Sequence, residues 1–180
     1  MDAKEKARRI KMILMDVDGT MTNGSLYILQ NGEEVKSYNV RDGLGILLAD
    51  LAGFKTGIIT GKNSKALEIR AQKLRISELY QGIIHKKQVF LEIKEKHKLK
   101  AKEIAYIGDD VGDLEVIQAV GLAGAVSDAH PLIKENSDYI CSQKGGSGAV
   151  REFIEFILTA QNKWGEIKDK FNDLKRETEE

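Results

Sequence analysis

The chain has 180 residues, and its 28 basic and 28 acidic side chains give a formal net charge of zero. This length suits one domain with a sizeable core, the balanced charge without a long basic run argues against a nucleic-acid partner, and no apolar stretch reaches membrane-spanning length. Cys141 is the single cysteine, and the charged residues 1–9 are not followed by a signal-type apolar segment. We therefore expect a cytoplasmic protein with no membrane or nucleic-acid partner.

A short apolar run at residues 12–15 predicts a buried strand that ends in two carboxylates, Asp16 and Asp18. Gly19 follows at once, so the chain leaves the strand here and both side chains can point into one pocket. Two neighbouring carboxylates cost free energy unless a cation or a phosphoryl group lies between them, so this strand end is a candidate Mg²⁺ and phosphate site. Taken alone, the motif fits a strand followed by an Asp-rich turn equally well.

Residues 25–29 and 34–38 predict two short strands, and Asn31-Gly32 between them is a strong hairpin turn. We expect a small β-hairpin at about residues 22–38, inserted after the first strand. A two-stranded ribbon is unstable alone, so its apolar side chains need a partner surface. The hairpin is the one candidate for a cap domain, and it is too short to close a site by itself.

Two more apolar runs, residues 54–59 and 104–107, also end in polar residues. Thr60 follows the first run. The second run leads to an acidic cluster that consists of Asp109, Asp110 and Asp113. Because ligands bind beyond the carboxyl ends of parallel strands, these residues are expected to meet Asp16 and Asp18 at one edge of a sheet.

Helix signals alternate with these strands. They lie at residues 43–51, after Asn63 or Ser64, and at about residues 86–98, and a further strand is predicted at residues 121–126. This rhythm predicts an α/β fold with a doubly wound parallel sheet. Lys86 lies between the second and third polar strand ends, where it could supply the positive charge that a phosphate needs.

The C-terminal segment carries a separate signal. Its apolar residues are spaced 3, 4, 3, 4, 3, 4, 3, which is an unbroken heptad seam. The first half can pack on the sheet, and the second half is expected to extend past the globule; a solvated tail is the alternative. We therefore expect one domain at residues 1–160 and a helical extension at residues 161–180. The seam consists of Val150, Phe153, Ile157, Ala160, Trp164, Ile167, Phe171 and Leu174.

The ordered set of polar residues resembles the haloacid-dehalogenase-like phosphatases, whose motifs are D-x-D, a Thr or Ser, a Lys, and G-D-D-x-x-D. The resemblance is strongest to members that act on acidic eight- and nine-carbon sugar phosphates, and it runs from about residue 10 to about residue 160. It implies a Rossmann-like, capless fold. It also rests on four further segments, at residues 39–43, 80–82, 128–131 and 145–152.

The resemblance implies a reaction through an aspartyl-phosphate. Asp16 would be the nucleophile, Asp18 the general acid and base, and Thr60 and Lys86 would contact the phosphate. Mg²⁺ would be held by Asp16, Asp109 and the main-chain carbonyl of Asp18. Behind this group, Asp110 could hold Lys86 or a metal-bound water, and Asp113 could brace the loop.

The resemblance also implies the sugar contacts. Besides Asp18 and Lys86, these would come from the segment Asn39, Val40, Arg41, Asp42 and Gly43 and from Lys62 and Arg70. Two departures put the sugar in doubt: Lys62 stands where an Arg is common, which loses a bidentate fork for a carboxylate, and Leu47 stands where close relatives often carry another Arg. The implied substrate is an octulosonate 8-phosphate of lipopolysaccharide precursor biosynthesis, with a nonulosonate 9-phosphate as the alternative. The implied assembly is a homotetramer.

Two other classes compete with a phosphatase. Receiver domains of signalling systems also gather an acidic pair, an acceptor Asp, a Thr and a Lys at the strand ends of a parallel sheet, but they need no D-x-D. A catalytically silent assembly module is the other, although every catalytic motif position is filled in this chain. Incubation with a generic aryl phosphate and Mg²⁺ separates all three classes.

Overall fold

The computed structural model describes residues 1–177, and side chains are described up to residue 171. Its centre is a six-stranded sheet in which every neighbouring pair of strands is parallel. The order across the sheet is β5-β4-β1-β6-β7-β8. These strands are β1 (Met12–Met15), β4 (Lys55–Ile59), β5 (Glu78–Tyr80), β6 (Ile104–Gly108), β7 (Leu122–Ala125) and β8 (Tyr139–Ile140).

The sheet is wound in two directions from its centre. From β1 the chain passes to β4 and β5 on one side, and it then returns to β6, β7 and β8 on the other side. The direction reverses between β1 and β6, which are neighbours in the sheet. In open parallel sheets the ligand binds at this reversal, beyond the carboxyl ends of the strands. The predicted doubly wound α/β sheet is confirmed.

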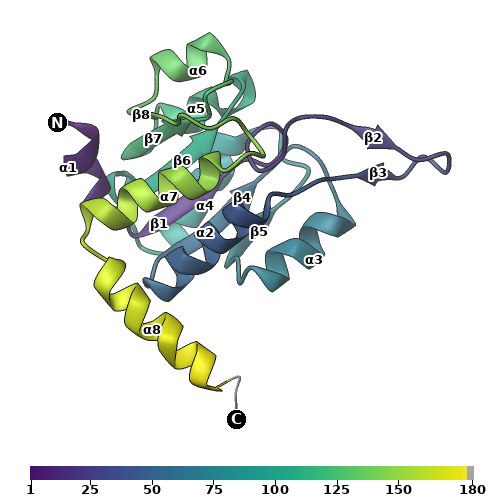
Figure 1. Ribbon diagram of the computed structural model, residues 1–180. Helices are drawn as coiled ribbons and strands as arrows, with labels where there is room; N and C mark the ends of the chain where they lie inside the picture. Colours follow the sequence, from purple (N-terminus) through teal and green to yellow (C-terminus); the bar gives the residue numbers. More distant parts are fainter. Residues whose placement is uncertain (178–180) are drawn as a thin grey trace.

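Helices cover both faces of the sheet (Figure 1). On one face α2 packs against α7, and α1 lies beside α7; on the other face α5 packs against α4 and α6. The helices are α1 (Ala3–Ala7), α2 (Val40–Leu51), α3 (Lys65–Lys73), α4 (Lys86–Lys96), α5 (Leu114–Ile117), α6 (Pro131–Glu135), α7 (Ala149–Ala160) and α8 (Trp164–Glu177), with single 3₁₀ turns η1 (Ala101–Glu103) and η2 (Val111–Asp113). Within the described residues, no helix is long and apolar enough to cross a membrane.

The two central strands are fully covered. Every residue of β1 and every residue of β6 is buried. A strand with helices on both faces is apolar along its whole length rather than at alternate positions, which explains why these runs are visible in the sequence. The edge strands β5 and β8 have only three and two residues. The sequence does not predict them, because runs this short carry no periodic signal.

Helix α2 begins at Val40 and not at residue 43, where the first helix signal lies. Asn39 is its N-cap, since the side chain accepts a hydrogen bond from the main-chain N–H of Arg41 at 2.8 Å. An Asn at this position satisfies a donor that the helix itself leaves unpaired. The segment 39–43 is therefore the cap and first turn of a helix that starts at the carboxyl edge of the sheet.

The hairpin forms, but its paired part is shorter than predicted. β2 (Tyr27–Ile28) and β3 (Glu34–Val35) are antiparallel, and Gly32 supplies the positive φ of 82° in the turn between them. Both strands are exposed. Figure 1 shows the ribbon projecting away from the sheet and its helices.

The apolar seam of the C-terminal segment crosses a break between two helices. α7 ends at Ala160, and Asn162 in the turn at residues 161–163 has a positive φ of 55°. The heptad spacing continues through the turn, so it does not reveal that the direction of the chain changes. The first half of the seam is buried in the core, as expected: it consists of Val150, Phe153, Ile157 and Ala160.

Helix α8 packs against α2 instead of extending past the globule along its whole length. Ile167 is buried in the hydrophobic core, and the ammonium group of Lys170 donates to the carbonyl of Leu51, at the end of α2, at 2.8 Å. The expectation of a free second half is therefore wrong for the start of α8. The last seam residue, Leu174, lies outside the described side chains.

Candidate active site

The polar residues at the strand ends lie in one pocket of about 310 Å³. Asp16 follows β1, Thr60 follows β4, and Asp109 follows β6, so the reversal of the sheet brings these three together. Lys86 reaches the pocket from the first residue of α4. The pocket is lined by Asp16, Asp18, Thr60, Gly61, Lys62, Ile83, Ile84, Lys86, Asp109, Asp110, Gly112 and Asp113.

A buried ion-pair network holds Lys86 beside Asp16. The Lys86 ammonium lies 2.5 Å from Asp16 Oδ1 and 2.6 Å from Asp113 Oδ1. Burial alone would lower the pKa of Lys86, but the two carboxylates outweigh it and raise that pKa. Lys86 therefore stays positively charged, within hydrogen-bonding distance of the carboxylate that is expected to attack phosphorus.

Asp113 is a bracing residue, because both of its oxygens are occupied within the chain. Oδ1 accepts from Lys86 and from the buried Tyr106 hydroxyl at 2.6 Å. Oδ2 accepts from the main-chain N–H groups of Asp109, at 3.0 Å, and Asp110, at 3.5 Å. Besides Asp16, the carboxylate that contacts Lys86 is therefore that of Asp113 and not that of Asp110.

Asp110 is exposed and has a different local role. Its side chain accepts a hydrogen bond from the N–H of Val111 at 2.7 Å and so caps the 3₁₀ turn η2. It lines the pocket, and among the described residues its carboxylate makes no hydrogen bond to Lys86. A contact between Asp110 and a metal-bound water is compatible with this position and stays a prediction.

Three carboxylates crowd together at the centre of the pocket. Asp16, Asp109 and Asp113 each offer an oxygen within 4.8 Å of the others. Burial, followed by repulsion from Asp113, raises the pKa of Asp16 to about 6. Burial, followed by repulsion from Asp16, raises the pKa of Asp109 to about 8. A bound divalent cation would remove this repulsion, and an all-oxygen donor set is the kind that Mg²⁺ prefers.

Because Asp113 is fully engaged, Asp16 and Asp109 are the side chains that fit a metal. The Thr20 hydroxyl donates to Asp109 Oδ1 at 3.0 Å and fixes this carboxylate. A Cβ on Gly19 would lie 2.0 Å from Asp109 Oδ2, and Gly19 has a φ of 96°. Both facts require a glycine in the loop that joins Asp16 to the hairpin.

Asp18 points toward the hairpin. Its carboxylate forms an ion pair with the ammonium group of Lys36. Lys36 lies on residues 34–38, the arm of the hairpin that returns to the sheet. The sequence motifs do not identify Lys36, because a charged residue in a hairpin usually lies in solvent. Polar residues do not alternate with apolar ones along this arm, since Lys36 is followed by Ser37, so no local pattern in the sequence identifies Lys36.

The segment 39–43 does not line this pocket as a unit. Asp42 is buried, and its oxygens accept from the N–H groups of Gly148, at 3.3 Å, and Arg151, at 2.9 Å. These bonds anchor Asp42 to the start of α7, and a sugar contact by Asp42 stays a prediction. Arg41 lines a separate hollow with Arg151, and Val40 is exposed.

Helices also place Arg70, an expected sugar contact, and Leu47, which stands where relatives often carry an Arg. Arg70 on α3 lies over the start of α2, where a Cβ on Gly43 would come within 2.2 Å of Arg70 Nη2. Gly43 therefore makes room for this guanidinium. Leu47, by contrast, lines the groove between α2 and α8 together with Phe171, and it is not among the residues of the pocket.

The loop that contains Gly145 and Gly146 packs against the loop that follows Asp16 and Asp18. A Cβ on Gly145 would lie 1.7 Å from the carbonyl oxygen of Gly19, and one on Gly146 would lie 2.5 Å from the nitrogen of Asn23. Main chain therefore packs directly on main chain. This contact explains the two adjacent glycines, for which the sequence alone offers only a resemblance.

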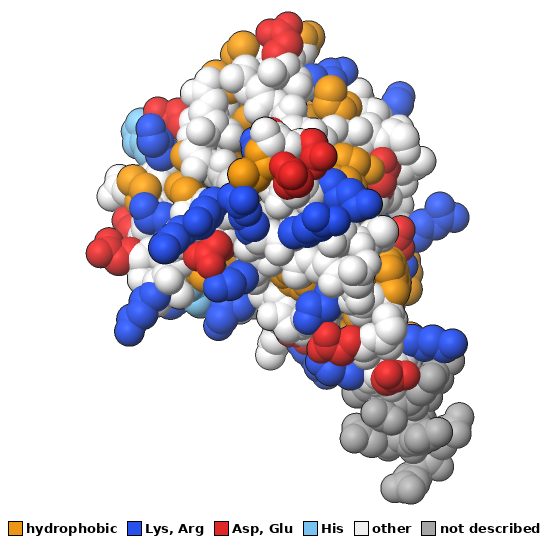
Figure 2. Space-filling view, turned by 90° about the vertical axis from the view of Figure 1, so that its left-hand side faces the viewer, with side chains coloured by type: hydrophobic (Ala, Val, Ile, Leu, Met, Phe, Trp, Pro, Cys, Tyr) orange, Lys and Arg blue, Asp and Glu red, His pale blue; other side chains and the backbone are white. Residues whose placement is uncertain are grey.

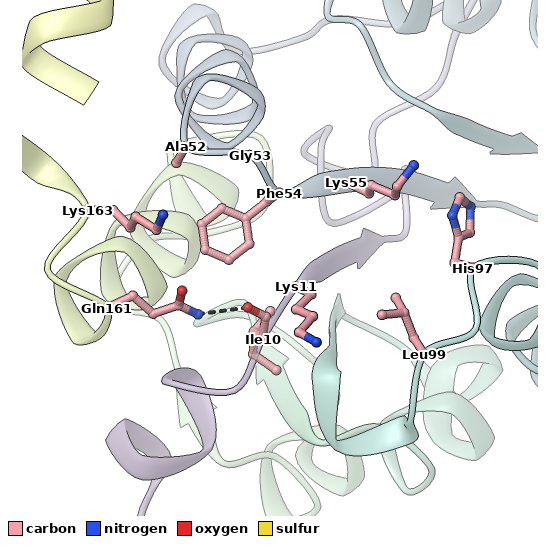
Figure 3. A pocket seen from close by; sticks show the side chains of 10 residues that line it. All are labelled: Ile10, Lys11, Ala52, Gly53, Phe54, Lys55, His97, Leu99, Gln161 and Lys163. Carbon is pink, nitrogen blue, oxygen red and sulfur yellow. Dashed lines mark hydrogen bonds between the residues drawn. The ribbon is translucent and has the colours of Figure 1, made fainter. Parts of the chain in front are cut away.

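A second hollow, of about 340 Å³, lies at the opposite edge of the sheet (Figure 3). Phe54 projects into it, and Gln161 donates to the carbonyl of Ile10 at 2.8 Å. Lys and Arg side chains gather on this edge with acidic side chains among them (Figure 2), and Lys11 is paired with Glu103 at 2.7 Å. Its lining residues include no carboxylate, so it offers neither a nucleophile of this kind nor acidic metal ligands.

Comparison with known proteins identifies the family of this chain. A family model described as haloacid dehalogenase-like hydrolase matches residues 51–154. The chain belongs to the haloacid dehalogenase-like hydrolases. It is 43% identical over 167 residues to the 3-deoxy-D-manno-octulosonate 8-phosphate phosphatase KdsC of Escherichia coli, across 93% of this chain and 89% of that protein.

Solved structures agree with this membership. A 3-deoxy-D-manno-octulosonate 8-phosphate phosphatase from Moraxella catarrhalis, in complex with magnesium ion, phosphate ion and KDO, is 36% identical with a TM-score of 0.91, over 94% of this chain and 97% of that one. The cobalt-bound deoxy-D-mannose-octulosonate 8-phosphate phosphatase from Haemophilus influenzae is 38% identical with a TM-score of 0.84, over 87% of this chain and 92% of that one.

Proposed function

We propose that the chain is a Mg²⁺-dependent phosphatase that hydrolyses 3-deoxy-D-manno-octulosonate 8-phosphate to the free sugar acid and phosphate, in lipopolysaccharide precursor biosynthesis. The observation that carries the proposal is the group of the buried Asp16, Lys86 and Asp113 with the half-buried Asp109 at the reversal of the sheet. Relatives named for this reaction, at 43% identity across most of the chain, support the substrate.

The reaction proceeds in two displacements. Asp16 attacks phosphorus, the bond from phosphorus to the sugar oxygen breaks, and Asp18 donates a proton to that oxygen. Asp18 then takes a proton from the water that hydrolyses the aspartyl-phosphate and releases Asp16. Thr60 donates to a phosphate oxygen, and Lys86 balances the negative charge that develops.

Asp16, Asp109 and the main-chain carbonyl of Asp18 would hold Mg²⁺, which would mask the charge of the phosphoryl oxygens. Asp113 acts indirectly in this mechanism, because it fixes both Lys86 and the main chain at Asp109. Lys62 at the rim and Arg70 over α2 are the cations that we assign to the acid group of the sugar.

A phosphate-release screen over sugar phosphates at constant Mg²⁺ tests the substrate. The highest kcat/KM is expected for the octulosonate 8-phosphate. A nonulosonate 9-phosphate is the second candidate, because Lys62 and Leu47 replace arginines that are common in the family. A higher kcat/KM for the nonulosonate would move the assignment to that sugar, and no release from any phosphate ester would remove the phosphatase itself.

Removal of the metal is expected to abolish activity. The donors at the site are oxygens, so Mg²⁺ should restore the EDTA-treated protein, Mn²⁺ and Co²⁺ should restore part of the rate, and Ca²⁺ should inhibit. Ca²⁺ accepts more ligands at longer distances, which relaxes the in-line geometry. Phosphate release after EDTA treatment and metal addition measures this, and a rate that resists EDTA contradicts the assignment.

Mg²⁺ is expected to stabilise the fold more at high pH than at low pH. In the metal-free protein the pKa values of Asp16 and Asp109 are raised from 3.8 to about 6 and about 8. The folded state therefore binds more protons than the unfolded chain, and the free energy of unfolding falls as the pH rises from 3.8 to about 8. Mg²⁺ takes the place of these protons and relieves the loss.

The measurement is the rise in Tm on adding Mg²⁺, compared below pH 6 and above pH 8. At one fixed Mg²⁺ concentration, 100 times the Kd above pH 8, the gain above pH 8 is about 2.7 kcal/mol, or about 5 to 10 °C for a domain of this size, and the gain below pH 6 is smaller. NaCl at matched ionic strength is the control. An equal rise at both pH values contradicts the role of these two carboxylates.

The assembly that we propose is a homotetramer in the cytoplasm. The hairpin supports it, because both of its strands are exposed although they carry apolar residues. A barrel of four ribbons would bury these side chains and bring each ribbon to a neighbouring active site. Residues 1–160 form the catalytic domain in this proposal, and residues 161–180 form a helical extension. The exposed apolar residues of the ribbon are Leu26, Tyr27, Ile28, Leu29 and Val35.

A further inference from the structure

The returning arm of the hairpin, residues 34–38, presents one polar side to the active site. Glu34 lies 3.4 Å from Lys62 at the rim of the pocket, and Lys36 pairs with Asp18. The third residue on this side is Tyr38, whose hydroxyl is buried and has no hydrogen-bond partner within the described part of the chain. Side chains two residues apart on an extended segment share a side, so the three act as one surface.

Lys36 is the most deeply buried member of this surface. Its side chain is 5% exposed, whereas that of its partner Asp18 is 28% exposed. A lysine is rarely buried unless it is paired, because removal of the ammonium group from water is costly. Its one hydrogen bond among the described residues is to Asp18 Oδ1. The pair is therefore a specific feature of the hairpin and not a surface contact.

The carboxylate of Asp18 in turn depends on Lys36 for a hydrogen bond. It lies beyond the end of β1, in the loop that leads into the hairpin, and no hydrogen bond to its carboxylate other than that of Lys36 is found in the described residues. The carboxylate of Asp16, by comparison, is held by Lys86 at 2.5 Å. Proton donation requires that the carboxyl group lie within hydrogen-bonding reach of the leaving oxygen. A neighbouring residue therefore has to hold the Asp18 side chain in position.

We propose that Lys36 is a positioning residue, which holds the Asp18 carboxylate and so couples the hairpin to proton transfer to the leaving oxygen. This inference rests on the proposed function. It assigns the arm a role in the chemistry of its own chain, in addition to any contact between subunits. Lys36 acts through Asp18, so its effect depends on how much the leaving group needs a proton.

The experiment compares Lys36→Met and Lys36→Arg on the full-length protein with Mg²⁺, using phenyl phosphate and 4-nitrophenyl phosphate. Phenolate is the poorer leaving group and needs the proton more. We compare kcat/KM, which reports the steps up to departure of the leaving group and not the later hydrolysis of the aspartyl-phosphate that both substrates share. We expect Lys36→Met to lower kcat/KM for phenyl phosphate by about 10²-fold, the low end for general acid catalysis, and to lower kcat/KM for 4-nitrophenyl phosphate by less than about threefold. Lys36→Arg keeps the charge and should recover most of the rate.

A double-mutant comparison separates positioning from a structural role. In an Asp18→Asn background, Lys36→Met should cause no further loss for phenyl phosphate, because the group that it positions has lost its function. The matched control is Lys65→Met, which removes an exposed lysine paired with Glu68 and should leave both rates unchanged. Lys36→Gln replaces Lys36→Met in the comparison if the latter does not fold.

Two results overturn the inference. They are an equal loss of kcat/KM for the two leaving groups and a loss that persists in the Asp18→Asn background. Both use aryl phosphates, so they are independent of which sugar phosphate is the substrate. If the unmutated protein releases phosphate from neither aryl phosphates nor sugar phosphates, the proposed phosphatase function fails and this inference fails with it.

Discussion

Asp16→Asn is expected to remove essentially all phosphatase activity while the fold stays intact. The amide cannot attack phosphorus, and loss of a nucleophile typically lowers kcat by about four orders of magnitude or more. The fold should tolerate the change, because the amide has nearly the same shape and one of three crowded carboxylates loses its charge. Lys86 keeps its contact with Asp113 at 2.6 Å.

Phosphate release from 4-nitrophenyl phosphate and Tm measure the two parts of this prediction. Asp169→Asn is the matched control, since it makes the same chemical change at an exposed position on α8. A rate for Asp16→Asn within tenfold of the unmutated protein would show that Asp16 is not the nucleophile. A large fall in Tm would show that the substitution tests the fold instead of the chemistry.

Ile28→Asp combined with Val35→Asp should dissociate the assembly. In the ribbon Tyr27 pairs with Val35 and Ile28 pairs with Glu34, so the two substitutions place a charge on each side of it. Ile28 is 66% exposed and Val35 is 43% exposed, so neither substitution disturbs the core of one subunit. Burial of these new charges in a barrel of ribbons would be costly.

Light scattering gives the mass, and two substrates report the consequence for activity. The sugar phosphate should lose far more activity than 4-nitrophenyl phosphate, because only the sugar needs contacts from a neighbouring subunit. The matched control is Leu91→Asp with Ile140→Asp, two exposed apolar residues away from the hairpin, at 43% and 51% exposure. An unmutated protein that is monomeric, active and specific for the sugar would refute the tetramer.

Sequence patterns predict the central part of this fold much better than its margins. β1 and β6 are buried on both faces, so their apolar runs are continuous and visible. β5 and β8 lie at the sheet edges and are too short to show a period. The break between α7 and α8 depends on the positive φ of Asn162, which leaves the heptad spacing unchanged.

The same contrast applies to the site. The sequence predicts which acidic residues meet, because the carboxyl ends of parallel strands share an edge. It does not assign their separate roles, which depend on hydrogen bonds: Asp113 braces Lys86, whereas Asp110 caps a turn. Lys36 and the burial of Asp42 follow from tertiary contacts with residues distant in the sequence, and no local pattern encodes them.

The packing of the Gly145–Gly146 loop on Gly19 and Asn23 has a consequence for the order in which the protein is made. The ribosome completes β1 and the nucleophile loop well before Gly145 and Gly146, the main chain that supports this loop, emerge. Contacts between such distant segments form late, because a long loop of chain has to close first. A nascent or truncated chain that stops before residue 145 contains the catalytic aspartates but lacks the main chain that packs against the Gly19 loop. Acquisition of activity is thereby tied to synthesis of the chain through residue 146.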